Sequence, residues 1–388
     1  MVKTADIVIV GAGVTGCSIA MQLALRKAGR ILILDKSEVG FGGSGRSSAL
    51  VRMHYSFPGE VQLAVKSLEI FRHWPEIVGR PGDFRQTGFV RLVPAAEVER
   101  LRLNVEMQRS FGVNTSLIGP RELSELEPDW NVDDVVAAAY EPDSGYGDGA
   151  GAASDFLARA RELGAAYRPR TRVTGFRVAA GRATGVDTEE GPIEAPTVVA
   201  ATGPWSRPLL AAAGFDAPIE TEFHQVAILK NPAGLRGRGV ACIDSLTSLY
   251  YRREGRDMTL VGAFYGRRPS DPDAFPQTAG GEALAEMASG IARRVPRLAE
   301  AGLAHGITGV YDMSPDARPL LGELPGIAGL FLAAGFSGMG FKISPAVGLV
   351  MAERILDGRA TTVDIEPFRP GRFAEGRPIK AQHEYTDD

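Results

Sequence analysis

The feature that most constrains the fold is the segment "DIVIVGAGVTGCSIAMQLALRKAGRILILDK", which spans residues 6–36. Residues 6–10 and 30–34 are short apolar runs, as expected of strands that are buried on both faces of a parallel sheet. Between them an apolar pattern of helical period continues to about Lys27, and Gly29 ends it. The order of strand, helix and strand predicts a βαβ unit, which places the chain in the α/β class.

The glycines of this segment, Gly11, Gly13 and Gly16, have the spacing GxGxxG. In a βαβ unit the first permits a tight turn, the second lets the backbone approach a pyrophosphate at the helix N-terminus, and the third allows close helix–strand packing. Asp35, nineteen positions after Gly16, is placed to accept hydrogen bonds from a ribose hydroxyl. The pattern therefore predicts a dinucleotide site. Three neighbouring residues are expected to line it: Val14, Thr15 and Lys36.

Composition excludes several other classes of protein. The 388 residues are 44% hydrophobic and 23% charged, which is enough for two domains or one large interleaved unit. A net charge of -4 and a pI near 5.9 argue against nucleic acid or an anionic membrane as the main partner. Two cysteines without a CxxC pattern predict neither a disulfide scaffold nor a metal site. With no secretory signal and no apolar run of membrane-spanning length, we expect a reducing, cytoplasmic setting.

A second glycine- and serine-rich loop, "VGFGGSGRSSALVRMHY" (39–55), follows a few residues after Asp35. A domain that binds a nicotinamide dinucleotide normally continues with another helix and strand here, without a second flexible loop that suits an anion. The loop therefore favours FAD. Its cofactor-binding residues are expected to be Gly43, Ser44, Arg46, Ser47 and Ser48.

Four segments, in this order along the chain, resemble the flavoprotein family of D-amino-acid oxidase, glycine oxidase and sarcosine oxidase. They are the N-terminal fingerprint, "GRSSALVRMHY" (45–55), "VVAATGPWS" (198–206) and "SPDARPLLGELPGIAGLFLAAGFSGMGFKISPAVG" (314–348). The resemblance is greatest to the beta subunit of heterotetrameric sarcosine oxidases and to related proline or hydroxyproline dehydrogenase subunits. It implies that further residues lie beside the dinucleotide, namely Val173, Ala201, Thr202, Gly203 and Trp205.

The resemblance also implies an interleaved layout. A Rossmann-like FAD-binding domain with a parallel sheet would alternate with an α+β substrate domain that contains an antiparallel sheet. The FAD-binding domain would comprise residues 1–50, 140–215 and 305–365, and the substrate domain residues 51–139 and 216–304. The remaining residues, 366–388, are polar, and we expect them to form a loosely held C-terminal tail.

The glycine-rich stretch "AGFSGMGFKIS" (334–344) follows a predicted strand at 330–334. Ser344 and Pro345 are favourable for a helix start, so we expect a helix from there to about Leu356, before Gly358. The helix dipole would favour negative charge on the N1–C2=O edge of a flavin. The resemblance implies that this stretch covers the flavin through Gly338, Met339, Gly340, Phe341 and Lys342.

The resemblance implies candidates for the chemistry as well. Lys342 matches the lysine that binds the substrate carboxylate, and Arg52 is the second candidate for that anchor. Arg318 matches an arginine near the flavin, which either packs against the cofactor or contacts substrate. Tyr250 matches a tyrosine that closes the pocket, whereas Tyr251 should point to the other side of its strand.

Two histidines complete the set of candidates. His54 is the nearest titrating group to Arg52, and a lone histidine of this kind is either catalytic or structural. His224 opens an apolar strand, which favours a structural role.

The chain departs from the family at three places. Gly309 stands where monomeric sarcosine oxidases carry the cysteine that tethers FAD, so we expect noncovalent FAD. The stretch "SGYGDGAGAASDF" (144–156) has no histidine to tether a second flavin, FMN. Met339 replaces a histidine of monomeric sarcosine oxidases, which makes the pocket more apolar there and argues against sarcosine itself.

These features predict FAD-dependent oxidation of an amino acid or N-substituted amine that is sarcosine-, glycine- or proline-like. Hydride would pass to flavin N5, the imine would hydrolyse, and molecular oxygen or another acceptor would take the electrons. Oxidation of a 2-hydroxy acid or glycerol phosphate is one alternative. A flavin-bound subunit of a heteromeric dehydrogenase is the other, and the chain could also form a homo-oligomer.

Overall fold

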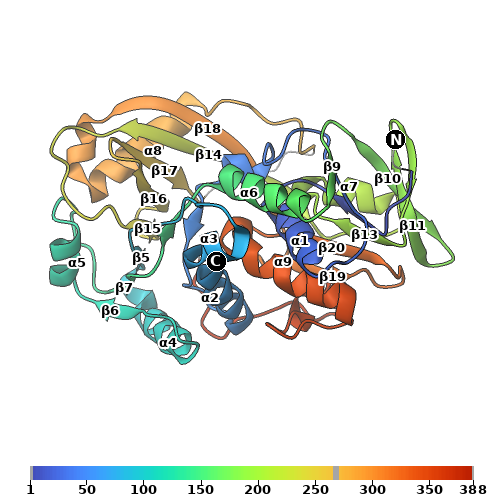
Figure 1. Ribbon diagram of the computed structural model, residues 1–388. Coiled ribbons are helices and arrows are strands. Elements are labelled where there is room, and N and C mark those ends of the chain that lie inside the picture. Colours follow the sequence, from blue (N-terminus) through green and yellow to red (C-terminus); the bar gives the residue numbers. More distant parts are fainter. Residues whose placement is uncertain (1–2, 265–270, 387–388) are drawn as a thin grey trace.

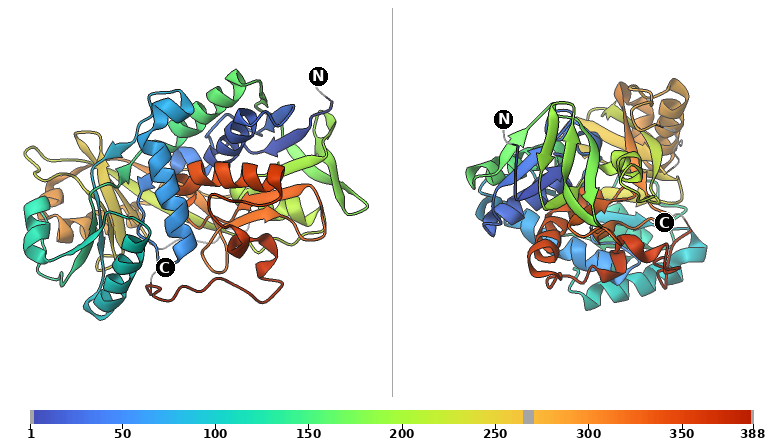
Figure 2. Two further views of the ribbon diagram at one scale, coloured as in Figure 1. Left: turned by 60° about the horizontal axis from the view of Figure 1, so that its bottom comes forward. Right: turned by 90° about the vertical axis from the view of Figure 1, so that its right-hand side faces the viewer.

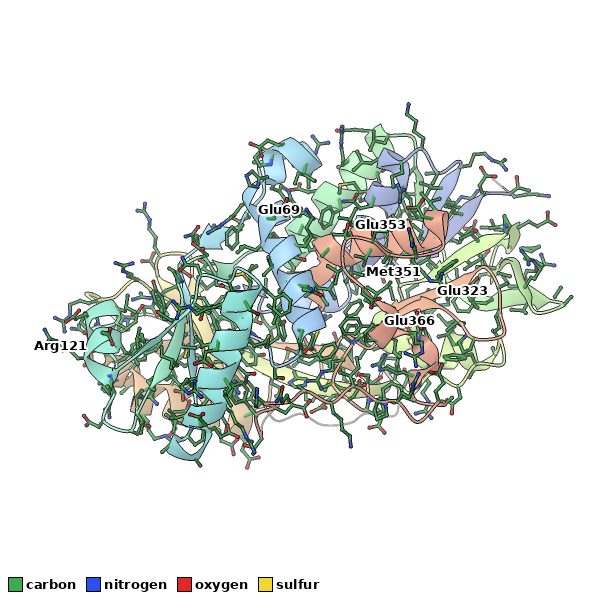
Figure 3. All side chains as sticks on the ribbon, turned by 90° about the horizontal axis from the view of Figure 1, so that it is seen from below. Glu69, Arg121, Glu323, Met351, Glu353 and Glu366 are labelled. Carbon is green, nitrogen blue, oxygen red and sulfur yellow. The ribbon has the colours of Figure 1, made fainter. Side chains whose placement is uncertain are left out.

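The computed structural model describes residues 3–264 and 271–386. Figure 1 shows an elongated molecule with a six-stranded sheet and its helices at one end and an eight-stranded sheet at the other. Figure 3 shows the molecule from below, with Arg121 at one end and Glu323 in the opposite half. Segments from both halves of the sequence contribute to each sheet, so the two parts are interleaved.

The six-stranded sheet has the order β19-β20-β13-β1-β2-β9. All neighbouring strands are parallel except β19, which is antiparallel to β20. The strands are β1 (Ile7–Val10), β2 (Ile31–Leu34), β9 (Ala166–Arg168), β13 (Thr197–Ala200), β19 (Leu320–Glu323) and β20 (Leu330–Ala334). Since β13 and β20 are far from β1 in the sequence, the centre of this sheet is built from distant segments of the chain.

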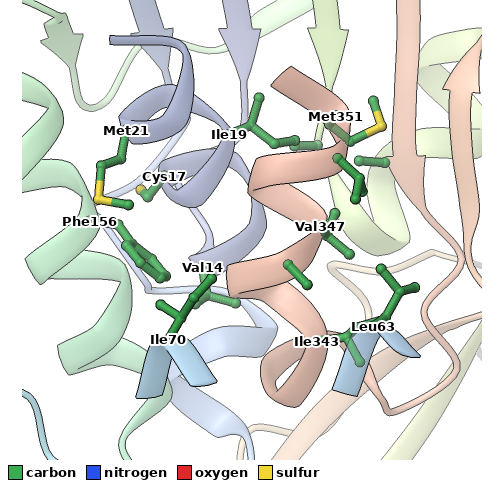
Figure 4. Packing of buried hydrophobic residues seen from close by; sticks show 14 of the residues in the cluster. Val14, Cys17, Ile19, Met21, Leu63, Ile70, Phe156, Ile343, Val347 and Met351 are labelled. Carbon is green, nitrogen blue, oxygen red and sulfur yellow. The ribbon is translucent and has the colours of Figure 1, made fainter. Parts of the chain in front are cut away.

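Four helices cover one face of this sheet: α1 (Val14–Leu25), α2 (Pro58–Arg72), α6 (Gly149–Glu162) and α9 (Gly340–Asp357). Figure 4 shows α1 and α9 packed along each other, with Ile19 of α1 beside Val347 and Met351 of α9. Gly348 makes this approach possible, because a Cβ atom there would lie 2.1 Å from Ser18 Oγ. The short helix α3 (Trp74–Val78) continues from α2 and contacts α6.

The other face of the six-stranded sheet is covered by a small antiparallel sheet and by α7 (Ser206–Ala211). The strands of this small sheet are β10 (Val173–Ala179), β11 (Arg182–Thr188) and β12 (Gly191–Glu194). The side chains of β1 alternate between the faces, since Ile7 and Ile9 belong to the helical core and Val8 and Val10 to this second core.

The eight-stranded sheet has the order β18-β14-β17-β16-β15-β5-β7-β6 and is antiparallel except between β15 and β5. Its strands are β5 (Phe89–Leu92), β6 (Ser116–Ile118), β7 (Ala138–Glu141), β14 (Glu220–Lys230), β15 (Ala241–Asp244), β16 (Leu249–Glu254), β17 (Met258–Ala263) and β18 (Gly302–Met313). Helix α8 (Gly281–Arg294) packs on one face, together with Tyr251. Tyr250 lies on the opposite face, as its place on the strand predicted.

The remaining elements lie at the edge of the larger sheet or between the two parts. Helices α4 (Val98–Ser110) and α5 (Pro120–Leu126) lie at the edge of the larger sheet, and a small sheet joins β3 (Leu50–Val51), β4 (Arg85–Gln86) and β8 (Gly145–Tyr146). The two views in Figure 2 show both parts from other sides. The predicted class, α/β with a parallel sheet interleaved with an α+β part that contains an antiparallel sheet, is confirmed. The predicted domain boundaries remain a prediction.

Helix α9 begins at Gly340, so the predicted start at Ser344 is wrong, although the end before Gly358 is confirmed. Pro345 lies inside the helix and has no N–H group to give to the carbonyl of Phe341. The hydroxyl of Ser344 donates to that carbonyl instead, at 2.8 Å. The cap signal of Ser344 and Pro345 therefore marks a repaired helical turn, and the true N-terminus comes directly after the glycine-rich loop.

The C-terminal segment is packed against the rest of the chain, so the expectation of a loosely held tail is wrong. The guanidinium of Arg372 is buried and pairs with both carboxylate oxygens of Asp316, at 2.7 and 2.9 Å. Ile379 and Tyr385 are also buried, and the amide of Asn104 on α4 donates to the carbonyl of His383 at 2.8 Å. The polar composition of the segment did not indicate this packing, because polar groups of the segment bond to distant parts of the chain.

None of the helices among residues 3–264 and 271–386 combines the length and the apolar character that crossing a bilayer requires. Within the same residues, histidine, cysteine, aspartate and glutamate side chains form no group of three or more that could hold a metal ion.

Candidate cofactor and substrate site

The turn after β1 has no room for side chains at two of its glycines. Gly11 has a φ of +107°, and a Cβ atom there would lie 2.2 Å from the carbonyl oxygen of Ala201. A Cβ atom on Gly16 would lie 2.0 Å from the carbonyl oxygen of Gly11. Both glycines are therefore required by the close packing of α1 and β13 against this turn, as the fingerprint predicts.

The N-terminus of α1 faces the second glycine-rich loop. The N–H of Val14 donates to the hydroxyl of Ser44 at 2.9 Å, and a Cβ atom on Gly13 would lie 3.2 Å from the same hydroxyl. The carboxylate of Asp35 accepts the N–H groups of Ala12 and Ser37, each at 2.7 Å. These contacts place a helix N-terminus, a hydroxyl and a fixed carboxylate around one opening, where phosphates and a ribose can bind.

A cavity of about 900 Å³, here named the FAD cavity, extends from this turn to the N-terminus of α9. This volume is at the upper end of the range for small-molecule sites, which suits a long dinucleotide. The predicted cofactor residues that line it are Gly11, Gly13, Val14, Thr15, Asp35, Lys36, Gly43, Ser44, Arg46, Ser47, Val173, Ala201, Thr202, Gly203, Trp205, Gly338, Gly340 and Phe341.

Five predicted cofactor residues lie outside the lining of this cavity: Gly16, Ser48, Arg318, Met339 and Lys342. Gly16 acts behind the wall through packing. The carbonyl of Ser48 accepts a hydrogen bond from Nε of Arg252 at 2.6 Å, which orders the loop. The side chain of Met339 packs in the core beneath the helices.

Asp312, which sequence reasoning missed, lines the FAD cavity and holds the glycine-rich loop before α9. Its carboxylate accepts the N–H of Gly335 at 2.6 Å, and its carbonyl accepts the N–H of Ser337 at 2.9 Å. Burial raises the pKa of Asp312 to about 6, while hydrogen bonds from backbone N–H groups act in the opposite direction. Since Gly340 and Phe341 also line the cavity, the first turn of α9 presents its N–H groups to a ligand there.

Residues 6–354 match the model of the DAO family, which is described as FAD dependent oxidoreductase. The chain belongs to this family. The family predicted from the sequence is thereby confirmed, the cofactor is FAD, and the chain is an FAD-dependent oxidoreductase.

Known relatives cover nearly the whole chain. Mitochondrial sarcosine dehydrogenase of Mus musculus is 27% identical over an alignment of 377 residues, which covers 92% of this chain and 40% of the mouse protein. The chain thus spans about two fifths of the length of that relative. Sarcosine oxidase subunit beta of Arthrobacter sp is 26% identical over 390 residues, with 97% of this chain and 93% of the subunit covered.

Solved structures share the fold. L-proline dehydrogenase from P. horikoshii superposes with a TM-score of 0.91 and 30% sequence identity, covering 98% of this chain and 100% of that chain. Glycine oxidase from Geobacillus kaustophilus superposes with a TM-score of 0.85 and 24% identity, covering 95% of this chain and 99% of that one.

The residues present suit FAD. The N-terminus of α1 and the loop at Ser44 would hold the pyrophosphate, and Asp35 would hold the ribose of the adenosine. The N-terminus of α9 would lie at the flavin. A tether from position 309 is excluded by its residue, because Gly309 has no side chain and an added Cβ atom would lie 3.2 Å from the side chain of Arg46.

Lys342 belongs to the first turn of α9, and Arg52 lies close to it. The ammonium group of Lys342 is buried and donates to the carbonyl of Gly338 at 3.1 Å. Burial lowers the pKa of Lys342 well below its usual value, Arg52 lowers it further, and Glu60 acts in the opposite direction. The guanidinium of Arg52 donates to the carbonyl of His54 and lies 4.2 Å from the ring centroid of Tyr55.

The structure places Arg318 among carboxylates and not in the wall of the FAD cavity. Its Nε lies 3.5 Å from Glu60 Oε2 on α2, and its Nη1 lies 2.5 Å from Glu384 Oε1 of the C-terminal segment. The charge of Glu60 also raises the pKa of Lys342, so Glu60 links Arg318 to the predicted anchor.

His54 is buried behind Arg52. Its Nε2 lies 2.8 Å from the hydroxyl of Tyr385, and its Nδ1 lies 3.9 Å from Glu141 Oε1. Burial lowers the pKa of His54 well below its usual value, and the charges of Arg91 and Arg52 lower it further. The imidazole is therefore neutral at pH 7, and the carbonyl of His54 accepts a hydrogen bond from Arg52, one of the two predicted anchor residues.

Tyr250 and Tyr311 meet at the boundary between the larger sheet and the FAD cavity. Their hydroxyl groups interact, and burial raises the pKa of both. The ring of Tyr250 lies over Gly262, where a Cβ atom would be 2.1 Å from it. Tyr311 lines the FAD cavity and packs against Gly338, whose added Cβ atom would lie 3.0 Å from the ring.

His224 stacks on Tyr311, with ring centroids 3.9 Å apart. Burial lowers the pKa of His224 to about 4, so the ring is neutral at pH 7. Sequence reasoning missed Tyr311 and treated His224 as a structural residue of its strand. The register between β14 and β18, which pairs His224 with Gly309, brings His224 against Tyr311, and Tyr311 lines the FAD cavity.

Proposed function

We propose that this enzyme oxidises an amino acid or an N-substituted amine with a free carboxylate, of the sarcosine, glycine or proline type. The observation that carries the proposal is the pair of cations, Lys342 and Arg52, beside the first turn of α9, which lines the FAD cavity. A buried amine beside a guanidinium suits an anionic ligand, because the anion favours the charged form of the amine. The relatives named for sarcosine, glycine and L-proline support the same substrate class.

In this proposal FAD, when bound, accepts hydride at N5 from the carbon next to the substrate nitrogen. Lys342 and Arg52 hold the carboxylate and so orient that carbon. The N–H groups at the start of α9 stabilise negative charge where it develops. Tyr250 and Tyr311 close the pocket from the side of the larger sheet.

The amine must be neutral before it is oxidised, yet these substrates carry an ammonium group in water. Lys342 has a lowered pKa in the free enzyme, so it can take up the proton that the substrate nitrogen gives up. Proton loss from the substrate and charging of the anchor would then occur together. His54 and His224, both neutral at pH 7, add no charge that opposes this exchange.

Anaerobic mixing of the purified holoenzyme with a substrate panel tests the proposal. N-methyl amino acids, proline analogues and glycine should bleach the flavin absorbance, whereas 2-hydroxy acids and glycerol phosphate should not. Bleaching by the hydroxy compounds alone would contradict it. Admission of air to the bleached sample then distinguishes an oxidase from a dehydrogenase, which needs another acceptor.

A flavin-bound subunit of a heteromeric enzyme is the second candidate. The match to sarcosine oxidase subunit beta covers 93% of that subunit, so it extends over nearly all of a protein that is named as a subunit. Activity of the isolated chain, measured together with its mass in solution, decides between the two.

A further inference from the structure

Residues 271–277 return from the part of the chain that forms the larger sheet and lie against the FAD cavity. They contribute Asp271, Pro272, Asp273, Phe275 and Gln277 to its wall. None of these residues belongs to the fingerprint or to the two glycine-rich loops, and their contacts to those loops are the basis of the inference.

The first contact is at the ribose end of the site. Both carboxylate oxygens of Asp273 accept the ammonium group of Lys36, at 2.7 and 3.0 Å. The same ammonium group lies 3.9 Å from the ring centroid of Trp205, which also lines the cavity. Lys36 directly follows Asp35, the residue placed for the adenosine ribose. One part of the segment is therefore fixed beside the residues that would hold that ribose.

The second contact is at the pyrophosphate end. Arg46 donates to the side-chain carbonyl of Gln277 at 3.0 Å, and its guanidinium lies 5.5 Å from the ring centroid of Phe275. Arg46 also donates to the carbonyl of Thr308 on β18 at 3.0 Å. It belongs to the loop whose Ser44 meets the N-terminus of α1. The other end of the segment is therefore fixed beside the loop that would hold the phosphates.

We propose that residues 271–277 form a clasp that closes over the adenosine and pyrophosphate part of bound FAD and slows its release. Lys36 and Arg46 belong to the dinucleotide fold and the clasp to the neighbouring part, so the contacts join the two parts across the cofactor. The side chains of Lys36 and Asp273 remain 23% and 51% exposed, so the ion pair is modest and sensitive to salt.

The test compares the rate of FAD release from holoenzyme, followed as the rise of free-flavin fluorescence after dilution. Asp273→Asn and Lys36→Met should each release FAD about three- to tenfold faster than the wild type, as expected for a partly exposed ion pair. The double variant should release it no faster than the faster single variant, because one contact is lost in all three. Added salt should speed release from the wild type and have little effect on the double variant.

Asp257→Asn is the matched control, since Asp257 is an exposed aspartate on the same part of the chain and lies outside the FAD cavity. Faster release in Lys36→Met together with a wild-type rate in Asp273→Asn would show that Lys36 acts on FAD alone, and would overturn the clasp. Hydrogen exchange gives a second readout: the backbone amides of 271–277 should exchange more slowly when FAD is bound. Unchanged exchange there would overturn it as well.

Discussion

The ammonium group of Lys342 donates to the carbonyl of Gly338, one turn earlier, at 3.1 Å, so the anchor lysine is held by the same loop that faces the flavin. This bond uses one of its three N–H donors and leaves the others for a substrate carboxylate. Lys342→Met should therefore keep FAD bound and raise the KM of carboxylate substrates by about 100-fold, as expected for loss of a charged contact of about 3 kcal/mol. Steady-state kinetics and the flavin spectrum measure both effects. Lys230→Met, at an exposed lysine, is the control, and an unchanged KM in Lys342→Met would remove this lysine from the anchor.

Proton uptake should depend on the kind of ligand. At a pH above the lowered pKa of free Lys342, binding of a simple carboxylate inhibitor should take up about one proton per site, because the anchor becomes charged. A zwitterionic substrate analogue should take up fewer, since its own ammonium group supplies the proton. Calorimetry in buffers of different ionisation enthalpy measures the difference. Equal uptake for both ligands, or uptake that persists in Lys342→Met, would contradict this exchange.

Gly11→Ala should abolish tight FAD binding. The added methyl group would lie 2.2 Å from the carbonyl oxygen of Ala201, and neither backbone can yield without moving β1 or β13. We expect a drop of more than about tenfold in FAD affinity together with a lower Tm, both measured on purified protein. Gly175→Ala, where an added Cβ atom meets nothing within 4 Å, should change neither.

Glu141→Gln should flatten the pH dependence of stability. Burial raises the pKa of Glu141 to about 7, although hydrogen bonds from Ser144 and from the backbone of Met53 act in the opposite direction. A carboxyl group with a raised pKa favours the folded state when protonated, so this contribution is lost as pH rises from about 4.5 to about 7.

Relative to the wild type, Glu141→Gln should gain up to about 3 kcal/mol of unfolding free energy over this interval, since each pKa unit corresponds to about 1.4 kcal/mol. Urea unfolding at pH 5 and pH 8 measures the change. Glu300→Gln, at an exposed glutamate, serves as the control. A constant difference between Glu141→Gln and the wild type across this range would contradict the assignment.

Removal of residues 378–388 should destabilise the protein although the segment is polar in composition. Ile379 and Tyr385 are buried, and each contributes roughly 1.5–3 kcal/mol by the usual scale for a buried side chain. The truncated chain should therefore show a lower Tm in thermal unfolding. Tyr385 contacts the ring of His54, and the carbonyl of His54 accepts a hydrogen bond from Arg52. We therefore also expect weaker carboxylate binding. Wild-type values of both would show that the segment is dispensable.

The parts of the site that could be predicted from sequence are those set by local backbone requirements. Gly11 in the turn after β1 and Gly16 in the first turns of α1 have no room for a side chain, and Asp35 follows the next strand. Strand β20 was also predicted with its observed bounds, because a short apolar run before glycines is a strong local signal.

What the sequence did not reveal depends on contacts between distant segments. His224 and Tyr311 meet only through the register of β14 with β18, and Asp273 reaches Lys36 across 237 positions of the chain. The start of α9 was misplaced because the hydroxyl of Ser344 compensates for Pro345 inside the helix. Such compensation cannot be read from residue preferences alone.

The FAD cavity takes its walls from Gly11 near one end of the chain and from Phe341 near the other. A ribosome therefore makes the phosphate-binding turn long before it makes the loop at the start of α9. Until that loop has been made, a nascent chain has only part of the wall of the FAD cavity. Both ends of the cofactor can therefore be held only after the second of these segments has been made.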